Sequence, residues 1–267
     1  MVIDIWDNET LPGAARDLLI AGDGLLRDYR ADELEIAASR PTEHVFWQRR
    51  PNAFAAGKAA LEADLAALIE NEEVRGFHYS RMIDEEIEAI SQAGIVPTSK
   101  AFLRQRVDGL VAAGYLNIIQ ADEVFAKSAL NAGETYGTRD CLFWTSAFPL
   151  PIDNSGVERL LAIWGGEVAS WTLSDNGEAL GLPTIGRPRI LEIAMPISTA
   201  MKGMAASAVA GRLVDLRMAE LGLTEYRGGI DLYTTVALEP SSLMFVHTEG
   251  EQAYADMGRG YPPTFKL

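Results

Sequence analysis

The sequence predicts an α+β fold, with a split or antiparallel-rich mixed sheet, flanking helices and an N-terminal helical extension. Two observations lead to this prediction. Helical patterns without a clear strand fill the chain up to Asn71, and roughly six strand-like runs follow at uneven intervals between helices. Uneven spacing argues against a regular βαβ repeat. We therefore expect a helical extension over residues 1–73 and an α+β domain over residues 74–267.

Apolar periodicity justifies the extension. Residues 53–69 are rich in Ala, Leu and Glu, and their apolar positions recur with a helical spacing of about 3.6 residues. An earlier run that contains Leu25, Tyr29, Leu34 and Ile36 predicts a second helix. Neither run alternates in the way that a strand would.

In the second part, aromatic or alternating runs predict strands, and capped amphipathic runs predict helices. Helices are expected from Asp84 to Gly94, from Ser99 to Gly114, and over residues 121–130, 155–164 and 201–221. Strands are expected over residues 74–81, 141–146, 167–173, 188–195, 230–238 and 243–248.

Composition limits the classes of function. Of the 267 residues, 48% are hydrophobic and 23% are charged, which is typical of a globular protein. The net charge of -15 disfavours nucleic acid as a high-affinity partner, because such affinity comes largely from cations that displace counterions. A local basic cleft would still accept a small anion. No apolar run approaches the roughly 18 residues of a membrane span, and no signal pattern precedes the first acidic residues, so we expect a cytoplasmic protein.

Several catalytic motifs are absent from the sequence. It contains no phosphate-binding Gly-rich loop before Lys-Ser or Lys-Thr, no Rossmann triple-glycine turn and no Gly-x-Ser-x-Gly elbow. His44, His78 and His247 are too far apart for a recognisable zinc motif, so no metal is expected. Cys141 lies in an apolar run and is interpreted as a buried, inert thiol.

The run Phe77-His-Tyr-Ser-Arg81, followed by a helix and by Ala93-Gly-Ile-Val-Pro97, resembles the opening of ADP-ribosyltransferase-like domains. The resemblance covers roughly residues 74–251. It implies that NAD is bound as a substrate, and it carries His78, Ser80 and Arg81 over to the pocket for the NAD ribose and phosphate. Strand alternation places His78 and Ser80 on one face and Tyr79 and Arg81 on the other. The alternative is a strand whose His is a satisfied core residue.

A second run, Phe143-Trp-Thr-Ser146, resembles the middle strand of the same superfamily. The resemblance implies that Thr145 or Ser146 positions NAD and that Trp144 or Phe143 stacks on nicotinamide. Strands commonly carry aromatic and β-branched residues, so an ordinary buried strand is the alternative.

The resemblance also implies a catalytic glutamate, because a carboxylate stabilises the cationic sugar formed in the reaction. Glu249 is the first candidate and Glu251 the second, although their position after a strand departs from the family pattern. Glu167 is a rival, since Gly165 and Gly166 before it allow close approach of the backbone to a ligand. Alternatively, the two glycines only end a helix.

We therefore expect an ADP-ribosyltransferase that uses NAD to modify a macromolecular acceptor, or a related NAD glycohydrolase. Two alternatives remain open. One is a non-catalytic interaction protein that binds a partner through its N-terminal helices. The other is a hydrolase of another ribosyl or phosphate-bearing ligand. The fold alone does not decide between them.

Overall fold

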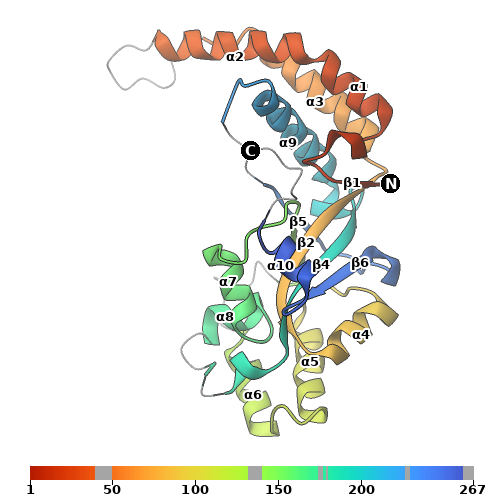
Figure 1. The fold of residues 1–267 in the computed structure, drawn as a ribbon, viewed down its shortest axis with the longest axis vertical. Coiled ribbons are helices and arrows are strands. Elements are labelled where there is room, and N and C mark those ends of the chain that lie inside the picture. Colours follow the sequence, from red (N-terminus) through yellow and green to blue (C-terminus); the bar gives the residue numbers. More distant parts are fainter. Residues whose placement is uncertain (40–49, 132–139, 174–176, 179, 226–228, 261–267) are drawn as a thin grey trace.

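The computed structural model describes residues 1–39, 50–131, 140–173, 177–178, 180–225 and 229–260, and it has the predicted α+β fold. At its centre is a mixed sheet in which the strands lie in the order β5-β3-β2-β4-β6, while β1 pairs with β2 (Figure 1). The strands are β1 (Val2–Ile3), β2 (Glu73–Met82), β3 (Phe143–Ser146), β4 (Arg187–Pro196), β5 (Asp231–Thr234) and β6 (Leu243–Thr248).

Two long antiparallel strands, β2 and β4, form the middle of the sheet and pair over all ten residues of each. Directly opposed residues of an antiparallel pair point to the same face, so the register assigns every side chain to a face. Gly76, His78 and Ser80 lie on one face, and Phe77 and Tyr79 lie on the other. The sequence prediction for His78 and Ser80 therefore holds. The β1–β2 pair is parallel, and the other pairs are antiparallel.

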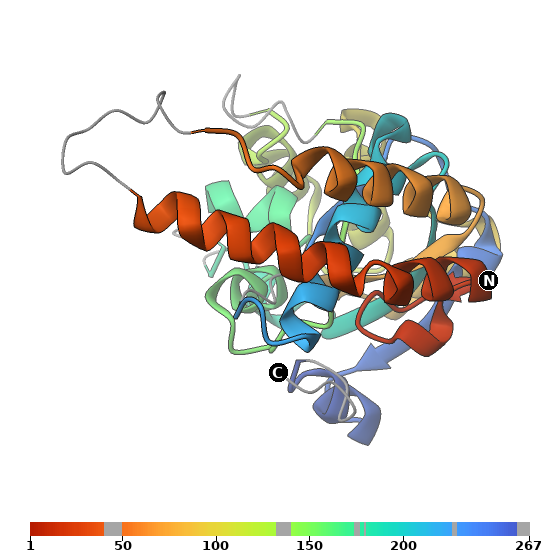
Figure 2. The same cartoon turned by 90° about the horizontal axis from the view of Figure 1, so that it is seen from above.

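Four helices pack together at one end of the sheet (Figures 1 and 2). They are α1 (Gly13–Ala21), α2 (Asp23–Ala38), α3 (Ala55–Ile69) and α9 (Ala205–Glu220). Leu19 and Leu65 from the N-terminal helices share one buried cluster with Leu213 of α9 and Leu191 of β4. The helices of the expected extension thus contribute to the same core as the sheet, and the boundary at residue 73 does not separate two cores.

Helices of the other group pack around the remainder of the sheet. They are α4 (Asp84–Ala93), α5 (Lys100–Ala112), α6 (Ile118–Lys127), α7 (Ser155–Ala162), α8 (Glu167–Leu173) and α10 (Gln252–Met257). Short 3-10 helices cover Asn8–Thr10, Leu182–Thr184, Ala200–Gly203 and Pro240–Ser242. The expected caps are present: the Ser99 hydroxyl accepts from the Phe102 amide at 3.1 Å, and Gly94 ends α4 with a φ of 85°.

Three sequence predictions are wrong. The chain up to Asn71, expected to lack a strand, contains β1, which pairs with β2. Residues 167–173, expected as a strand, form helix α8, because Val168, Ala169 and Leu173 are spaced to bury one helical face in a core cluster. Cys141 is exposed and has a φ of 59°, because it stands in the turn before β3 and outside the buried strand. Among the helices of the described ranges, none has both the length and the apolar character that crossing a membrane requires.

Candidate functional site

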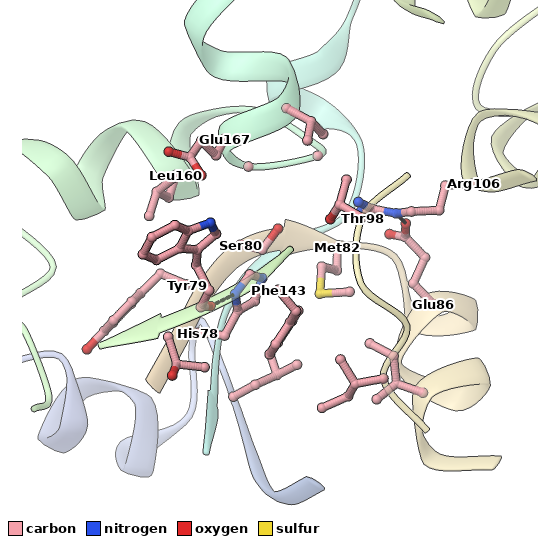
Figure 3. A pocket seen from close by; sticks show the side chains of 18 of the residues that line it. His78, Tyr79, Ser80, Met82, Glu86, Thr98, Arg106, Phe143, Leu160 and Glu167 are labelled. Carbon is pink, nitrogen blue, oxygen red and sulfur yellow. Dashed lines mark hydrogen bonds and ion pairs between the residues drawn. The ribbon is translucent and has the colours of Figure 1, made fainter. Parts of the chain in front are cut away.

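A cavity of about 880 Å³ lies beside the line where β2 and β3 diverge. These two strands share a single register pair, Phe77 with Ser146, although each pairs further with its other neighbour. Residues of β2, α4, α5, β3, α7 and the start of α8 line the cavity (Figure 3). Its lining includes no described residue before Phe77, so the N-terminal helices take no part in it.

His78 lies in the gap between the diverging strands and joins them through its side chain. Its Nδ1 is 2.9 Å from the carbonyl oxygen of Trp144, and its ring stacks on Phe143 with a centroid separation of 4.6 Å. A carbonyl oxygen only accepts hydrogen bonds, so Nδ1 carries the hydrogen and Nε2 is left as an acceptor. The His78 imidazole thus has a fixed tautomer and also lines the cavity.

The electrostatic setting keeps the His78 ring neutral. Burial lowers the pKa of His78 to about 4, and the positive charge of Arg106 acts in the same direction, against the opposing effect of the Trp144 carbonyl. The imidazole is therefore uncharged at neutral pH and can accept a hydrogen bond from a ligand hydroxyl. The ring lines the cavity as well as packing on Phe143, so it is not a core histidine enclosed by apolar groups alone.

The double glycine passes close to Ser80 of β2 and leads into Glu167, and both of these residues line the cavity. Gly165 and Gly166 both have positive φ, and the Gly165 amide donates to the Arg81 carbonyl at 3.3 Å. Gly166 has a φ of 55°, and a Cβ there would stand 3.0 Å from the Ser80 hydroxyl oxygen, so a larger residue would strain the backbone and crowd Ser80. The turn then delivers Glu167, the first residue of α8, to the cavity wall.

The run Phe143-Trp-Thr-Ser146 on β3 contributes to the cavity mostly through its backbone and through Thr145. The Trp144 carbonyl holds His78, while the Trp144 ring packs on Tyr233 at a centroid distance of 4.8 Å. Thr145 Oγ1 is buried and has no hydrogen-bond partner among the described residues. Ser146 Oγ accepts from the Phe148 amide at 3.4 Å. All four residues of the run line the cavity.

Three sequence-predicted site residues lie elsewhere. Arg81 is on the opposite face of β2, where it donates to the carbonyls of Leu161 and Gly186 and acts as a backbone clamp. Glu249 and Glu251 are exposed on the turn after β6, outside the cavity lining. Glu249, the first candidate for the catalytic glutamate, therefore does not line the cavity with His78, because it follows β6, an edge strand separated from β2 by β4.

Glu251 has a local role in that turn. Its carboxylate accepts from the Thr248 amide at 3.0 Å, immediately before α10. Glu167 is the only one of the three glutamate candidates that lines the cavity.

Sequence reasoning missed one charged pair in the cavity. Glu86 of α4 and Arg106 of α5 form an ion pair of 2.7 Å, and the Trp164 Nε1–H donates to Glu86 at 3.0 Å. Both charged residues line the cavity, on the side away from Glu167 (Figure 3). In the sequence, Glu86 is one of three acids at a helix start, and nothing links it to Arg106.

A partly buried network of charged side chains lies on the opposite face of the sheet. Arg75 bonds to Asp4 at 2.6 Å and also to Glu192, and the Nε2 of His247 is 2.6 Å from Glu192. These contacts join the N-terminal segment to β2, β4 and β6. Their residues lie outside the cavity lining, whereas His44, the third histidine, lies outside the described residues.

Comparison with known proteins adds no assignment: the chain matches no protein-family model, no curated protein and no solved structure.

Proposed function

We propose that the protein binds NAD in the cavity lined by β2, β3 and the neighbouring helices, and that it acts as an ADP-ribosyltransferase or a related NAD glycohydrolase. The observation that carries this proposal is that His78, Ser80 and Glu167 line one cavity. At about 880 Å³, that cavity lies within the range of known ligand sites, roughly 300–1,000 Å³.

The wall made by β2 and β3 suits a ribose. The neutral His78 ring offers Nε2 as an acceptor for a sugar hydroxyl, since its other nitrogen is bound to the Trp144 carbonyl. Ser80, on the same face of β2, adds a hydroxyl that both donates and accepts. Thr145 Oγ1 is a buried polar atom that bonds to none of the residues the structure describes, and a ligand hydroxyl would supply a partner.

Glu167 is the carboxylate that we assign to the reacting sugar. In the proposed reaction the bond between the nicotinamide nitrogen and the anomeric ribose carbon breaks, and its electron pair leaves with nicotinamide. The cationic sugar that results is stabilised by a nearby carboxylate, as in glycoside hydrolysis. A nucleophile of the acceptor then bonds to the same carbon and loses its proton. In a glycohydrolase this nucleophile is water.

Release of nicotinamide from NAD by the purified full-length protein tests this assignment. We expect Glu167→Gln to lower the turnover number by about 100-fold or more, because charge stabilisation of a transition state commonly contributes that much. Glu249→Gln is the matched control: it removes the same charge from an exposed position outside the cavity, and its turnover should stay within about two-fold of wild type.

A large loss of turnover in Glu249→Gln together with near wild-type turnover in Glu167→Gln would overturn the assignment of Glu167. The same assay with His78→Ala addresses the ribose wall, and unchanged turnover in that variant would remove His78 from the site.

A further inference from the structure

The wall of the cavity formed by α4 and α5 carries a guanidinium held in a fixed orientation. Arg106 Nε donates to Glu86 Oε1 at 2.7 Å, and the guanidinium carbon lies 4.8 Å from the centre of the Trp164 ring. The Arg106 side chain is only 13% exposed. Two different contacts therefore fix the plane of the guanidinium, which Figure 3 shows extending from α5 toward Thr98.

One nitrogen of this guanidinium has no partner in the part of the chain that the structure describes. Arg106 Nη2 is buried there and makes no hydrogen bond to any described residue. Glu86 does not supply one, because its Oε2 already accepts from the Trp164 Nε1–H and from the Ile83 amide, each at 3.0 Å. A buried donor without a partner costs about 1–3 kcal/mol, and more when it is charged, so such groups in native proteins call for an explanation.

Three charged side chains of the lining are separated across the cavity. Glu167 lies at one side, Arg106 and its partner Glu86 lie at the other, and His78 and Ser80 lie between them (Figure 3). The charge of Arg106 extends to His78, where it favours the neutral imidazole. A ligand with a cationic ring at one end and phosphate at the other would meet a carboxylate and a guanidinium, respectively.

We propose that Arg106 is the anion subsite of the cavity and binds a phosphate group of the ligand through Nη2. The identification of the ligand as NAD rests on the proposed function. The binding of a phosphate group by Arg106 does not. A phosphate oxygen is the acceptor that suits a planar guanidinium already oriented by a carboxylate and an indole. Arg106 thereby sets the direction in which the ligand lies, with its phosphates toward α5 and its reacting ribose toward Glu167.

Calorimetric titration of the full-length protein with three probes tests the subsite. ADP-ribose and inorganic pyrophosphate carry phosphate, and nicotinamide riboside carries none. Because a hydrogen bond to a charged group contributes roughly 1.5–3 kcal/mol, Arg106→Gln should weaken ADP-ribose and pyrophosphate binding by about 10-fold or more. Nicotinamide riboside should bind to this variant as it binds to wild type.

Arg104→Gln is the matched control, because it removes the same charge from the same helix. Arg104 pairs with Asp108 and Asp122 and is not part of the cavity lining. This variant should bind all three probes with wild-type affinity.

A second variant guards against misfolding, since Arg106→Gln leaves Glu86 without its partner. Glu86→Gln with Arg106→Gln removes both charges together, and thermal unfolding shows whether each variant folds. The double variant should show the same selective loss of the two phosphate probes.

Two results would overturn the subsite: wild-type binding of ADP-ribose and pyrophosphate by the folded variants, or no binding of either probe by the wild-type protein. Normal ADP-ribose binding by the variants together with nicotinamide release by the wild type would remove the subsite and leave the proposed function standing. Pyrophosphate binding that depends on Arg106, in a protein that releases no nicotinamide, would support the subsite and contradict the proposed function.

Discussion

At the scale of single residues, His78 shows how position converts an ordinary side chain into a defined chemical group. Burial and the charge of Arg106 keep the ring uncharged, and the Trp144 carbonyl fixes its tautomer. The ring also closes the gap left where β2 and β3 diverge. The same atoms thus contribute to stability and to the proposed binding of ribose.

The lowered pKa of His78 predicts how stability depends on pH. In the unfolded chain the ring titrates near its ordinary value of 6.5, and in the folded protein it titrates near 4. Between these values the unfolded chain binds more protons, so the free energy of unfolding falls as the pH decreases from 6.5 to 4. The contribution of this one group is at most about 3 kcal/mol.

Chemical denaturation at a series of pH values measures this effect, with His78→Asn as the comparison. In the variant, the free energy of unfolding should fall less steeply between pH 6.5 and pH 4. The part of the pH dependence that other groups cause should remain. A variant whose stability follows the wild-type pH profile in parallel would show that His78 titrates normally in the folded protein.

Sequence reasoning succeeded for the site where neighbours along the chain decide the geometry. Strand alternation was sufficient to place His78 with Ser80 and to place Arg81 on the other face. It failed for the Glu86–Arg106–Trp164 cluster, because Trp164 is 78 residues from Glu86 and only the packing of α4, α5 and the double-glycine turn brings them together. Glu249 was misplaced for the same reason, since strand order cannot be obtained from local patterns.

At the scale of elements, the local signals were strongest where a cap or a glycine marks a boundary. Ser99 and Gly94 stand at helix ends as predicted. Helix α8 was mistaken for a strand because its seven residues hold few periodic positions, and a short apolar run fits either period. The expected domain boundary at residue 73 followed a change from helical to mixed apolar periodicity. Periodicity along the chain does not show which surfaces pack together.

Helix α3 provides a direct test of the shared core. Leu65 is fully buried in the cluster that also contains Leu213 and Leu191, so Leu65→Ala should lower the free energy of unfolding by about 2–5 kcal/mol. Because the cluster spans the N-terminal helices and the sheet, thermal unfolding should remain a single transition that moves to lower temperature.

Leu68→Ala is the control on the same helix, where the side chain is 40% exposed and the change should cost less than about 1 kcal/mol. Two separate transitions, with only one displaced by Leu65→Ala, would instead show that the N-terminal helices fold as an independent unit.

At the scale of the whole molecule, the two ends of the sheet differ in structure: one carries a large buried cluster and the other carries the cavity. The N-terminal helices and α9 pack at one end (Figure 1) and complete the largest buried cluster of the described residues. Residues of α4, α5, α7 and α8 line the cavity. The net charge of -15 opposes the approach of anions, which gives a guanidinium inside the cavity particular importance for a phosphate-bearing ligand. The same charge disfavours a nucleic acid as the acceptor.

Calorimetric titration of the full-length protein with NAD tests the central claim most directly. We predict saturable binding at one site per chain, and we predict that His78→Ala, which alters the wall between β2 and β3, weakens it by about 10-fold or more. No heat of binding with either NAD or ADP-ribose would contradict the account and would favour a non-catalytic interaction protein.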